Sequence, residues 1–288
     1  MNLLSLKTLN RHNHSLDIIL LPNLLFILMK TKLYQVDAFT NNVFGGNPAA
    51  VCPLDAWIAD DLMQNIAMET NLADTAFYVP NGNGFDIRWF TTKMEVALCG
   101  HATLATAHVL FTHENYTGSE IVFNSKSGEL KVAKNGDWYM LDFPVDTLTE
   151  TEITTELKAG FNYSPIKAYK GKTDYILVFD SEDQIKTMQP DFDKIAKVDC
   201  RGIIVTAKGN EVDFVSRFFG PQSGLTEDPV TGSAHTSLTP YWAQVLGKTE
   251  FTAKQLSARR GFLKCALNGE RVLISGQAKT FMQGELEI

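Results

Sequence analysis

Two short segments of the sequence place proton-transfer groups beside a glycine at the start of a helix. Residues 89–107 read WFTTKMEVALCGHATLATA, and residues 218–239 read FFGPQSGLTEDPVTGSAHTSLT. Each runs from a strand that ends in aromatic residues, through a loop, to a Cys-Gly-His-Ala or Thr-Gly-Ser-Ala sequence that opens a helix. Helix N-termini bind carboxylate or phosphate, and glycine lets a ligand approach the backbone closely. We therefore predict that the corners at Gly100 and Gly232 face each other across an interdomain cleft and hold a small anionic substrate. The alternative is that both glycines only serve tight turns.

The same two corners carry side chains that can move a proton. His101 lies at a helix start, where the positive end of the helix dipole disfavours the imidazolium, so we expect a neutral imidazole able to relay a proton. Asp228 is interpreted either as a helix cap or as a protonated acid beside a substrate carboxylate. Ser233 could likewise cap the helix or donate a hydrogen bond to an anion. A structural role remains the alternative for each residue.

The elements that position these corners are mostly short strands. In the first half, alternating or apolar runs bounded by turn residues predict strands at 33–39, 49–52, 74–79, 85–90, 120–124, 128–133 and 138–143. One helix is predicted after Asp60 and Asp61, through Met68, and a second at 101–111, which is apolar enough to be buried on most faces. The second half repeats this order, with strands at 175–179, 202–206 and 212–219, a helix at about 232–246, and then strands to the end. An internal duplication explains the repeated order and the matching corners.

The polar and acidic stretch TLTETEITTE, which follows Pro144, predicts the domain boundary. We accordingly expect an N-terminal domain at 29–145 and a C-terminal domain at 146–288.

The N-terminal residues 1–28 are expected to be a disordered or mis-assigned extension. Their apolar run, residues 16–28, is interrupted by polar residues and a proline, and it is too short to span a bilayer. No A-x-A-like cleavage site follows it, and Met29 looks like a fresh start directly before a strand. These features argue against a secretory signal.

Composition narrows the function classes further. The chain has 288 residues, 44% hydrophobic and 20% charged, which indicates a globular protein and excludes a disordered or fibrous one. Its 33 acidic against 26 basic side chains, with no basic run, argue against a nucleic-acid partner. The four cysteines lie far apart without CxxC spacing, so we expect neither a zinc site nor a disulfide framework, but reduced thiols in the cytoplasm. No membrane partner is expected.

Five motifs follow one another along the chain: GNPAAV (46–51), NLADTAF (71–77), RWFTTKMEVALCGHATLA (88–105), EDPVTGSAH (227–235) and GQAKTFMQGEL (276–286). Together they resemble the phenazine-biosynthesis PhzF-like isomerase family, over nearly all of the chain from Lys32 onward. The resemblance implies a diaminopimelate epimerase-like α/β (α+β) fold with two similar domains, each a curved, mostly antiparallel sheet wrapped around a central helix. It also implies an active site between the domains and a homodimer.

The resemblance also implies site residues at matching motif positions. The implied catalytic residues are Asp74, His101, Asp228 and Ser233. The implied substrate-binding residues are Asn47, Gly100, Thr231 and Gly232. The family's acid/base is usually the Glu of N-L-S-E-T-A-F, whereas this chain reads N-L-A-D-T-A-F, so Asp74 keeps the carboxyl group on a shorter side chain.

The implied function is an isomerase that shifts a proton, and with it a double bond, on a small carboxylate-bearing metabolite without a cofactor or metal. A carboxylate in a poorly hydrated cleft has a raised pKa and can take a proton from carbon, while the corner N–H groups stabilise the enolate-like charge. Two alternatives are kept. One is a small-anion-binding protein that has lost catalysis, which the shorter Asp74 admits. The other is a two-thiol racemase, disfavoured because the second corner has Thr231 where the first has Cys99.

Overall fold

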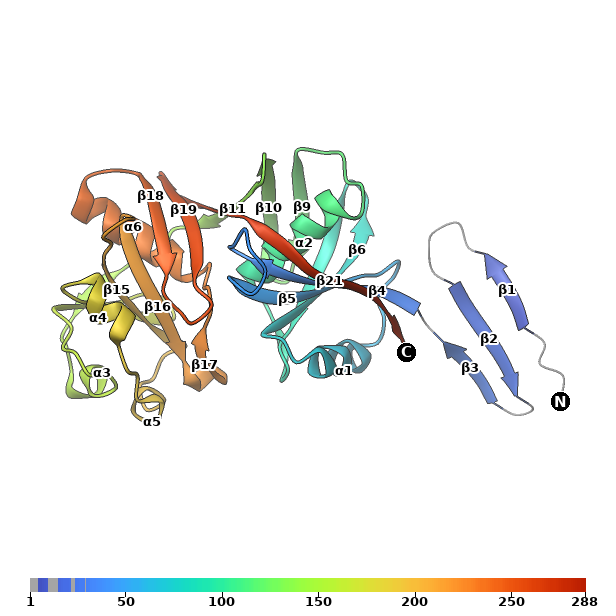
Figure 1. Cartoon of the computed structure of the whole chain (residues 1–288), viewed down its shortest axis with the longest axis horizontal. Coiled ribbons are helices and arrows are strands. Elements are labelled where there is room, and N and C mark those ends of the chain that lie inside the picture. The colour runs from blue at the N-terminus through green and yellow to red at the C-terminus, as the bar shows by residue number, and fades with distance from the viewer. Residues whose placement is uncertain (1–4, 10–14, 22–23, 29) are drawn as a thin grey trace.

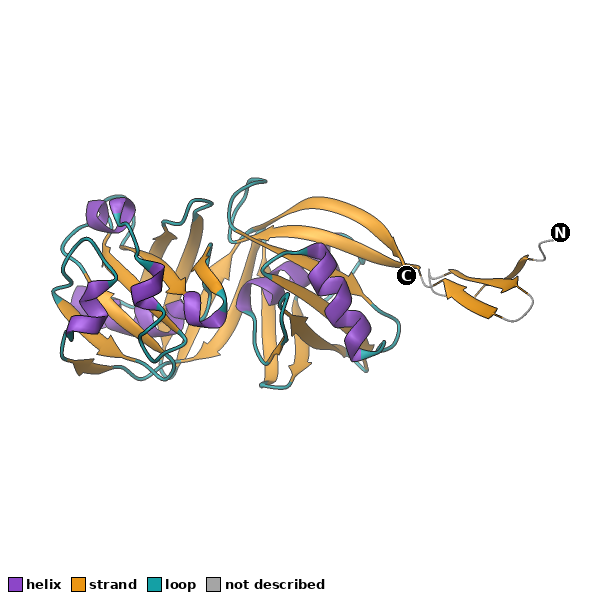
Figure 2. Cartoon of the chain, turned by 90° about the horizontal axis from the view of Figure 1, so that it is seen from below, coloured by secondary structure: helices purple, strands orange, loops and turns teal. Residues whose placement is uncertain are grey.

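The computed structural model of the chain describes residues 5–9, 15–21, 24–28 and 30–288. Its strands β4 to β21 are hydrogen-bonded edge to edge in one mostly antiparallel sheet that closes on itself, and this sheet builds two lobes (Figure 1). Each lobe combines helices and strands (Figure 2). Within the part of the chain that is described, no helix is both long and apolar enough to cross a membrane.

Three strands of the N-terminal extension form a separate antiparallel sheet, set apart from the two lobes in Figure 1. They are β1 (Ser5–Leu9), β2 (Ser15–Leu21) and β3 (Leu24–Leu28). The extension expected to be disordered therefore contains strands among its described residues. That it is mis-assigned or dispensable stays a prediction.

The first lobe contains the motif-bearing strands and the first central helix. Its elements are β4 (Lys30–Ala38), β5 (Asn47–Pro53), α1 (Asp60–Thr70), β6 (Asp74–Asn81), β7 (Gly84–Phe90), β8 (Glu95–Val96), α2 (Gly100–Thr112), β9 (Glu120–Ser125), β10 (Gly128–Asn135) and β11 (Trp138–Pro144).

The second lobe contains the second central helix. Its elements are β12 (Thr149–Thr151), α3 (Thr155–Ala159), β13 (Lys167–Lys170), β14 (Asp174–Val178), α4 (Glu182–Thr187), α5 (Phe192–Ile195), β15 (Gly202–Lys208), β16 (Phe214–Gly220), the 3-10 turn η1 (Pro221–Ser223), β17 (Leu225–Asp228), α6 (Ala234–Leu246), β18 (Glu250–Gln255), β19 (Gly261–Asn268) and β20 (Arg271–Gly276). The last strand, β21 (Ala278–Glu287), returns to the first lobe, where it pairs with β4.

The two lobes repeat one order of elements. In the first, β5 and β6 are parallel and joined through α1; in the second, β14 and β15 are parallel and joined through α4 and α5. An antiparallel strand follows in each, β7 or β16, and α2 or α6 then leads to a strand parallel to it, β9 or β18. This arrangement confirms the predicted α/β fold class, and it is the order that an internal duplication predicts.

The central helix α2 is enclosed because its sequence has almost no polar face. All ten residues at positions 101–110 are buried. The Ala-rich composition keeps the helix narrow, so strands can pack close to it on most sides. Burial of this helix fixes the position of its N-terminus, which is the first glycine corner.

The other central helix, α6, tolerates a proline inside it. Pro240 has no backbone N–H, so it cannot serve the carbonyl of Thr236 one turn earlier. That carbonyl instead accepts a hydrogen bond from the backbone N–H of Asp146, at 3.2 Å. The Asp146 carboxylate also accepts a 2.8 Å bond from the Ser237 hydroxyl. The chain just after the predicted boundary is therefore attached to α6.

The predicted elements match the structure except where they are short. The stretch read as a linker contains β12, which pairs with β13, and the start of α3. The sequence analysis also missed the short strands β8, β13 and β17 and the short helices α4 and α5. The domain boundary near residue 145 stays a prediction, with β21 of the C-terminal half lying beside β4.

Candidate active site

The two glycine corners meet. A Cβ atom placed on Gly100 would lie 3.7 Å from the Cα of Gly232, and one placed on Gly232 would lie 3.8 Å from the Cα of Gly100. The rings of Phe143 and Phe39 flank the two positions, at 3.8 Å from the Gly100 Cβ and 3.6 Å from the Gly232 Cβ. The start of α2 and the turn before α6 thus approach from the two lobes to van der Waals distance.

Neither glycine is required by the protein's own packing. All of these distances are ordinary van der Waals contacts, and neither residue has the left-handed backbone that favours glycine. By contrast, a Cβ on Gly276 would lie 2.3 Å from the Phe39 ring, so that glycine serves packing. Packing and backbone conformation thus leave both glycines unexplained, and close approach of a ligand to the backbone is a reason for a residue without a side chain.

The first corner gathers an acid, a thiol and an imidazole. Asp74 is the first residue of β6, beside Ala49 of the parallel strand β5, and this position brings its carboxylate to the start of α2. Its Oδ2 lies 3.6 Å from His101 Nε2, and the Cys99 thiol donates a hydrogen bond to it. Cys99 Sγ also lies 3.5 Å from His101 Nδ1. The shorter carboxyl side chain therefore still reaches the corner.

The second corner holds Asp228 in a network that crosses between the lobes. Asn47, at the start of β5, donates from Nδ2 to Asp228 Oδ1 at 2.7 Å and to the Val230 carbonyl at 2.9 Å. The Thr231 hydroxyl donates to Asp228 Oδ2 at 2.6 Å. Gln255, which sequence reasoning missed, donates to the Asp228 carbonyl at 2.8 Å and accepts from the Thr231 N–H at 2.9 Å. All of these side chains are buried.

Burial changes the acidity of both carboxyl groups. It raises the pKa of Asp74 to about 7; the hydrogen bond from Cys99 opposes this rise, and the charge of Asp228 adds to it. Burial likewise raises the pKa of Asp228 to about 6, against the hydrogen bonds from Thr231 and Asn47. Each of the two carboxyl groups therefore gains and loses its proton near neutral pH. Acid and base catalysis requires groups that titrate in this range.

The other two titratable groups stay neutral. Burial lowers the pKa of His101 to about 4, so its imidazole is uncharged at neutral pH, in the form that the sequence analysis expects. Burial and the nearby charge of Asp74 raise the pKa of the Cys99 thiol well above its ordinary value. Cys99 is thus a protonated thiol that contacts both Asp74 and His101.

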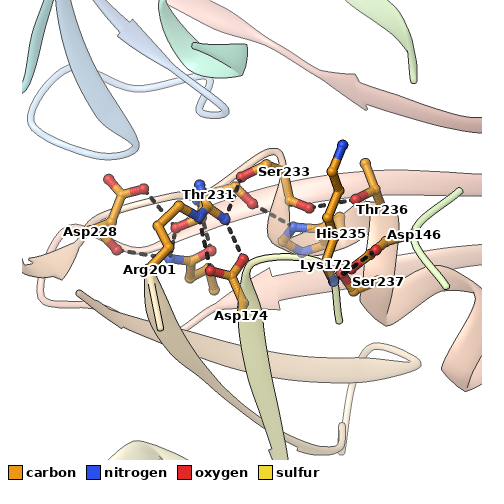
Figure 3. Close-up of polar contacts among 11 residues, drawn as sticks. Asp146, Lys172, Asp174, Arg201, Asp228, Thr231, Ser233, His235, Thr236 and Ser237 are labelled. Carbon is orange, nitrogen blue, oxygen red and sulfur yellow. Dashed lines mark hydrogen bonds and ion pairs between the residues drawn. The ribbon is translucent and has the colours of Figure 1, made fainter. Parts of the chain in front are cut away.

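Ser233 lies beside the second corner but makes a contact that the sequence did not indicate. It precedes α6, and its Oγ accepts a 3.1 Å hydrogen bond from the guanidinium of Arg201 (Figure 3). No motif of the sequence analysis includes Arg201, which directly precedes β15. The predicted residues therefore fall into two groups, Asp74 and His101 at the first corner and Asn47, Asp228, Thr231 and Ser233 at the second, on either side of the paired glycines.

Two other features bear on what the site could hold. One ligand atom each of Asp74, Cys99 and His101 lie within 4.8 Å of one another, close enough to surround a metal ion. The thiolate is the form of cysteine that binds metals, and the raised pKa of Cys99 disfavours it. A surface hollow of about 490 Å³ lies elsewhere, lined by Val145, Asp146, Thr147, Thr149, Lys170, Gly171 and Lys172. We place the candidate site at the glycine corners because two carboxyl groups with raised pKa values, Asp74 and Asp228, lie at these corners.

Comparisons with known proteins cover nearly the whole chain. The family of phenazine biosynthesis-like proteins (PhzC-PhzF) matches residues 36–284. An uncharacterized isomerase of Pseudomonas aeruginosa is 50% identical, over 90% of this chain and 100% of its own length. A phenazine biosynthesis-like domain-containing protein of Mus musculus is 39% identical, over 90% and 99% respectively. The crystal structure of a PhzF family protein of Enterococcus faecalis superimposes with a TM-score of 0.88 at 45% identity, over 90% and 100%.

Proposed function

Because the chain belongs to the phenazine biosynthesis-like (PhzC-PhzF) family, we propose that it is an isomerase that moves a proton, and with it a double bond, on a small carboxylate-bearing metabolite. The observation that carries the proposal is the meeting of Gly100 and Gly232 with a buried acid on each side. Relatives of this chain from Pseudomonas aeruginosa and Halalkalibacterium halodurans are named isomerases.

The substrate carboxylate binds at the paired corners. Backbone N–H groups at the starts of the two central helices point toward an anion, and the helix dipoles favour its charge. The absence of side chains on Gly100 and Gly232 lets the carboxylate reach these groups. When the neighbouring carbon loses its proton, the same donors stabilise the enolate-like charge.

Asp74 moves the proton. In its charged form it takes the hydrogen from the carbon next to the carboxylate, and the electron pair delocalises over the adjacent double bond. Asp74, now protonated, returns the hydrogen to the far end of the conjugated system, so the double bond moves and no atom is gained or lost. The neutral His101, 3.6 Å away, assists this transfer, and Asp228 and Ser233 hold the substrate in place.

An experiment on a simple unsaturated acid tests the proposal. Cyclohex-2-ene-1-carboxylate has a hydrogen that is both allylic and next to the carboxylate, and its isomerisation gives the conjugated cyclohex-1-ene-1-carboxylate. We expect the wild-type protein to accelerate this conversion, measured by proton NMR. Asp74→Ala should abolish the acceleration, and Asp74→Glu, which supplies the family's usual residue, should retain it. Asp142→Ala is the matched control, because Asp142 pairs with Arg271 on the surface of β11. An Asp74→Ala variant with the wild-type rate would contradict the role of Asp74.

The proposal needs no metal. We predict that dialysis against EDTA leaves the isomerisation rate unchanged, because every step uses a side chain or backbone group of the chain. Loss of activity that Zn²⁺ restores would show instead that Asp74, Cys99 and His101 hold a functional ion. The homodimer and the cytoplasmic location expected from the sequence also stay predictions. Light scattering, which measures the molar mass in solution, would test for the homodimer.

A further inference from the structure

Arg201 is held beside the second glycine corner by the pairing of two strands. Strands β14 and β15 are parallel, with Asp174 opposite Gly202, so Arg201 lies directly next to Asp174. The Arg201 N–H donates to the Thr173 carbonyl at 2.9 Å, which fixes the backbone at this point. The side chain then reaches Asp174 and Ser233, the residue before α6, as Figure 3 shows.

The guanidinium of Arg201 is held by contacts along one edge, with Asp174, and against one face, with Phe218. Its Nε donates to Asp174 Oδ1 at 2.8 Å and its Nη2 donates to Asp174 Oδ2, so both carboxylate oxygens of a buried residue are engaged. Its face lies 5.1 Å from the centre of the Phe218 ring. A planar guanidinium held in this way is preorganised. About 38% of the side chain nevertheless remains exposed, in contrast to 5% for Asp174.

The contact with Arg201 determines what the Ser233 hydroxyl can do. Arginine has no hydrogen-bond acceptor, so in the 3.1 Å contact the Nη2 group donates and the Ser233 oxygen accepts. The hydroxyl hydrogen must then point away from the guanidinium. Ser233 directly follows Gly232, so this orientation makes the hydroxyl a donor beside the corner where the substrate carboxylate is placed.

Arg201 also supplies positive charge where the neighbouring acids are negative. Glu227 is already paired with Arg217, whose Nε and Nη2 donate to its two carboxylate oxygens at 2.7 and 3.0 Å. Among the described residues no arginine or lysine forms such a pair with Asp228; the charge of Arg201 acts on it and lowers its pKa, against the larger effect of burial. An incoming carboxylate therefore meets the field of Arg201 at the second corner.

We propose that Arg201 is a positioning residue that selects a carboxylate at the second corner, by directing the Ser233 hydroxyl toward it and by opposing its charge. This inference rests on the proposed function, because it assumes that the paired corners hold the substrate carboxylate. It assigns Asp174 the task of orienting Arg201. It predicts that selectivity for a charged over an uncharged ligand depends on these three side chains.

Benzoate and benzamide test this selectivity, since they differ in charge but hardly in shape. Their dissociation constants are measured by NMR titration with the full chain. We expect the wild type to bind benzoate about 10- to 100-fold more tightly than benzamide, as for a charge-assisted hydrogen bond. Arg201→Met should lose most of this preference while its affinity for benzamide changes less than about twofold. Arg201→Lys keeps the positive charge but lacks the planar set of guanidinium N–H donors. Its preference for benzoate should lie between those of the wild type and Arg201→Met.

Two further variants keep the test independent of folding. Ser233→Ala leaves the Arg201–Asp174 pair intact and should also reduce the preference for benzoate. The double variant Arg201→Met/Ser233→Ala should lose no more of this preference than Arg201→Met alone, because the two residues act as one unit. Arg271→Met is the control, since Arg271 makes a similar pair with Asp142 but is 46% exposed and has no contact with the corners among the described hydrogen bonds.

The outcomes separate the two proposals. A wild-type protein that does not prefer benzoate would contradict the carboxylate site itself, and with it the proposed function. A wild-type preference that Arg201→Met and Ser233→Ala both retain would overturn only the role of Arg201. Equal losses in Arg201→Met and Arg271→Met would also overturn it, because the effect would then reflect net charge.

Discussion

At the residue scale, the chemistry of Asp74 and Asp228 comes from where they are placed. Both are ordinary acids in the sequence, and burial moves their pKa values to about 7 and about 6. The motifs indicated both residues and the neutral state of His101. They could not indicate Arg201, just before β15, or Gln255, at the end of β18, which reach the site from positions distant in sequence and carry no local pattern. Contacts of this kind depend on strand register, which a single sequence does not specify.

The pH dependence of activity follows from the paired acids. We predict a bell-shaped profile of kcat/KM for the ring isomerisation with its maximum between about pH 6 and pH 7, because Asp74 must be charged to take the proton, while Asp228 must be protonated to donate a hydrogen bond to the substrate carboxylate that it holds. The Asp228 charge raises the pKa of Asp74, so Asp228→Asn should move the remaining limb to lower pH. Rates measured from pH 4.5 to 9 check this; an unmoved limb would show that the two groups do not interact.

Stability should also depend on Asp74. Between the ordinary pKa of 3.8 and about 7, the unfolded chain has lost this proton while the folded protein keeps it, so stability falls as the pH rises through this window. Asp74→Asn cannot titrate. We predict that its free energy of unfolding, relative to the wild type, rises by about 2–4 kcal/mol from pH 4 to pH 7.5, at about 1.4 kcal/mol for each pKa unit. Urea denaturation measures this difference, and parallel curves for the two proteins would refute it.

At the element scale, the site depends on the two helix starts. The buried helix α2 and the proline-containing helix α6 were both predicted near their observed bounds, because each is a mostly apolar segment longer than most strands. The short helices α3, α4 and α5 were missed because elements of four to six residues hold too few apolar positions to show one. Their first turns are capped by Thr154, Ser181 and Asp191, a local signal that could have found them.

Gly100 at the start of α2 separates stability from function. An alanine there meets its neighbours at ordinary contact distances and suits a helix better, so Gly100→Ala should gain about 0.5–1 kcal/mol of stability. The added methyl group occupies the space for the carboxylate, so kcat/KM should fall at least about tenfold. Thermal unfolding and isomerisation rates are measured together.

Gly247, the left-handed cap at the end of α6, is a control for which the opposite effects on stability and activity are expected. Gly247→Ala should lose about 1 kcal/mol of stability and keep its activity, because its backbone conformation, and not a ligand, requires glycine. A Gly100→Ala variant that keeps full activity would mean that no ligand approaches this position.

At the scale of the whole molecule, the candidate site lies between two lobes that repeat one order of elements, as an internal duplication predicts. Each lobe supplies a glycine corner at the start of its central helix, and Asn47 of one lobe binds Asp228 of the other. The sequence predicted the repeat from two short segments. It did not predict that β21 returns to pair with β4, because the sequence of one strand does not specify which distant strand it pairs with.

The N-terminal sheet lies apart from this arrangement. Strands β1 to β3 pair with one another, and the family match begins at residue 36. We predict that a variant starting at Met29 keeps kcat/KM, with a melting temperature within about 2 °C of the full chain, a shift that corresponds to less than about 1 kcal/mol. A larger loss in either quantity would assign the extension a role in the enzyme.

Solvent-hydrogen exchange gives the most direct test of Asp74 as the group that moves the proton. In heavy water, the wild-type protein should place deuterium at the carbon that gains hydrogen when cyclohex-2-ene-1-carboxylate becomes the conjugated acid, as detected by deuterium NMR. Asp74→Ala should yield no deuterated product above the uncatalysed background. Deuterium incorporation by Asp74→Ala at the wild-type rate would contradict the account.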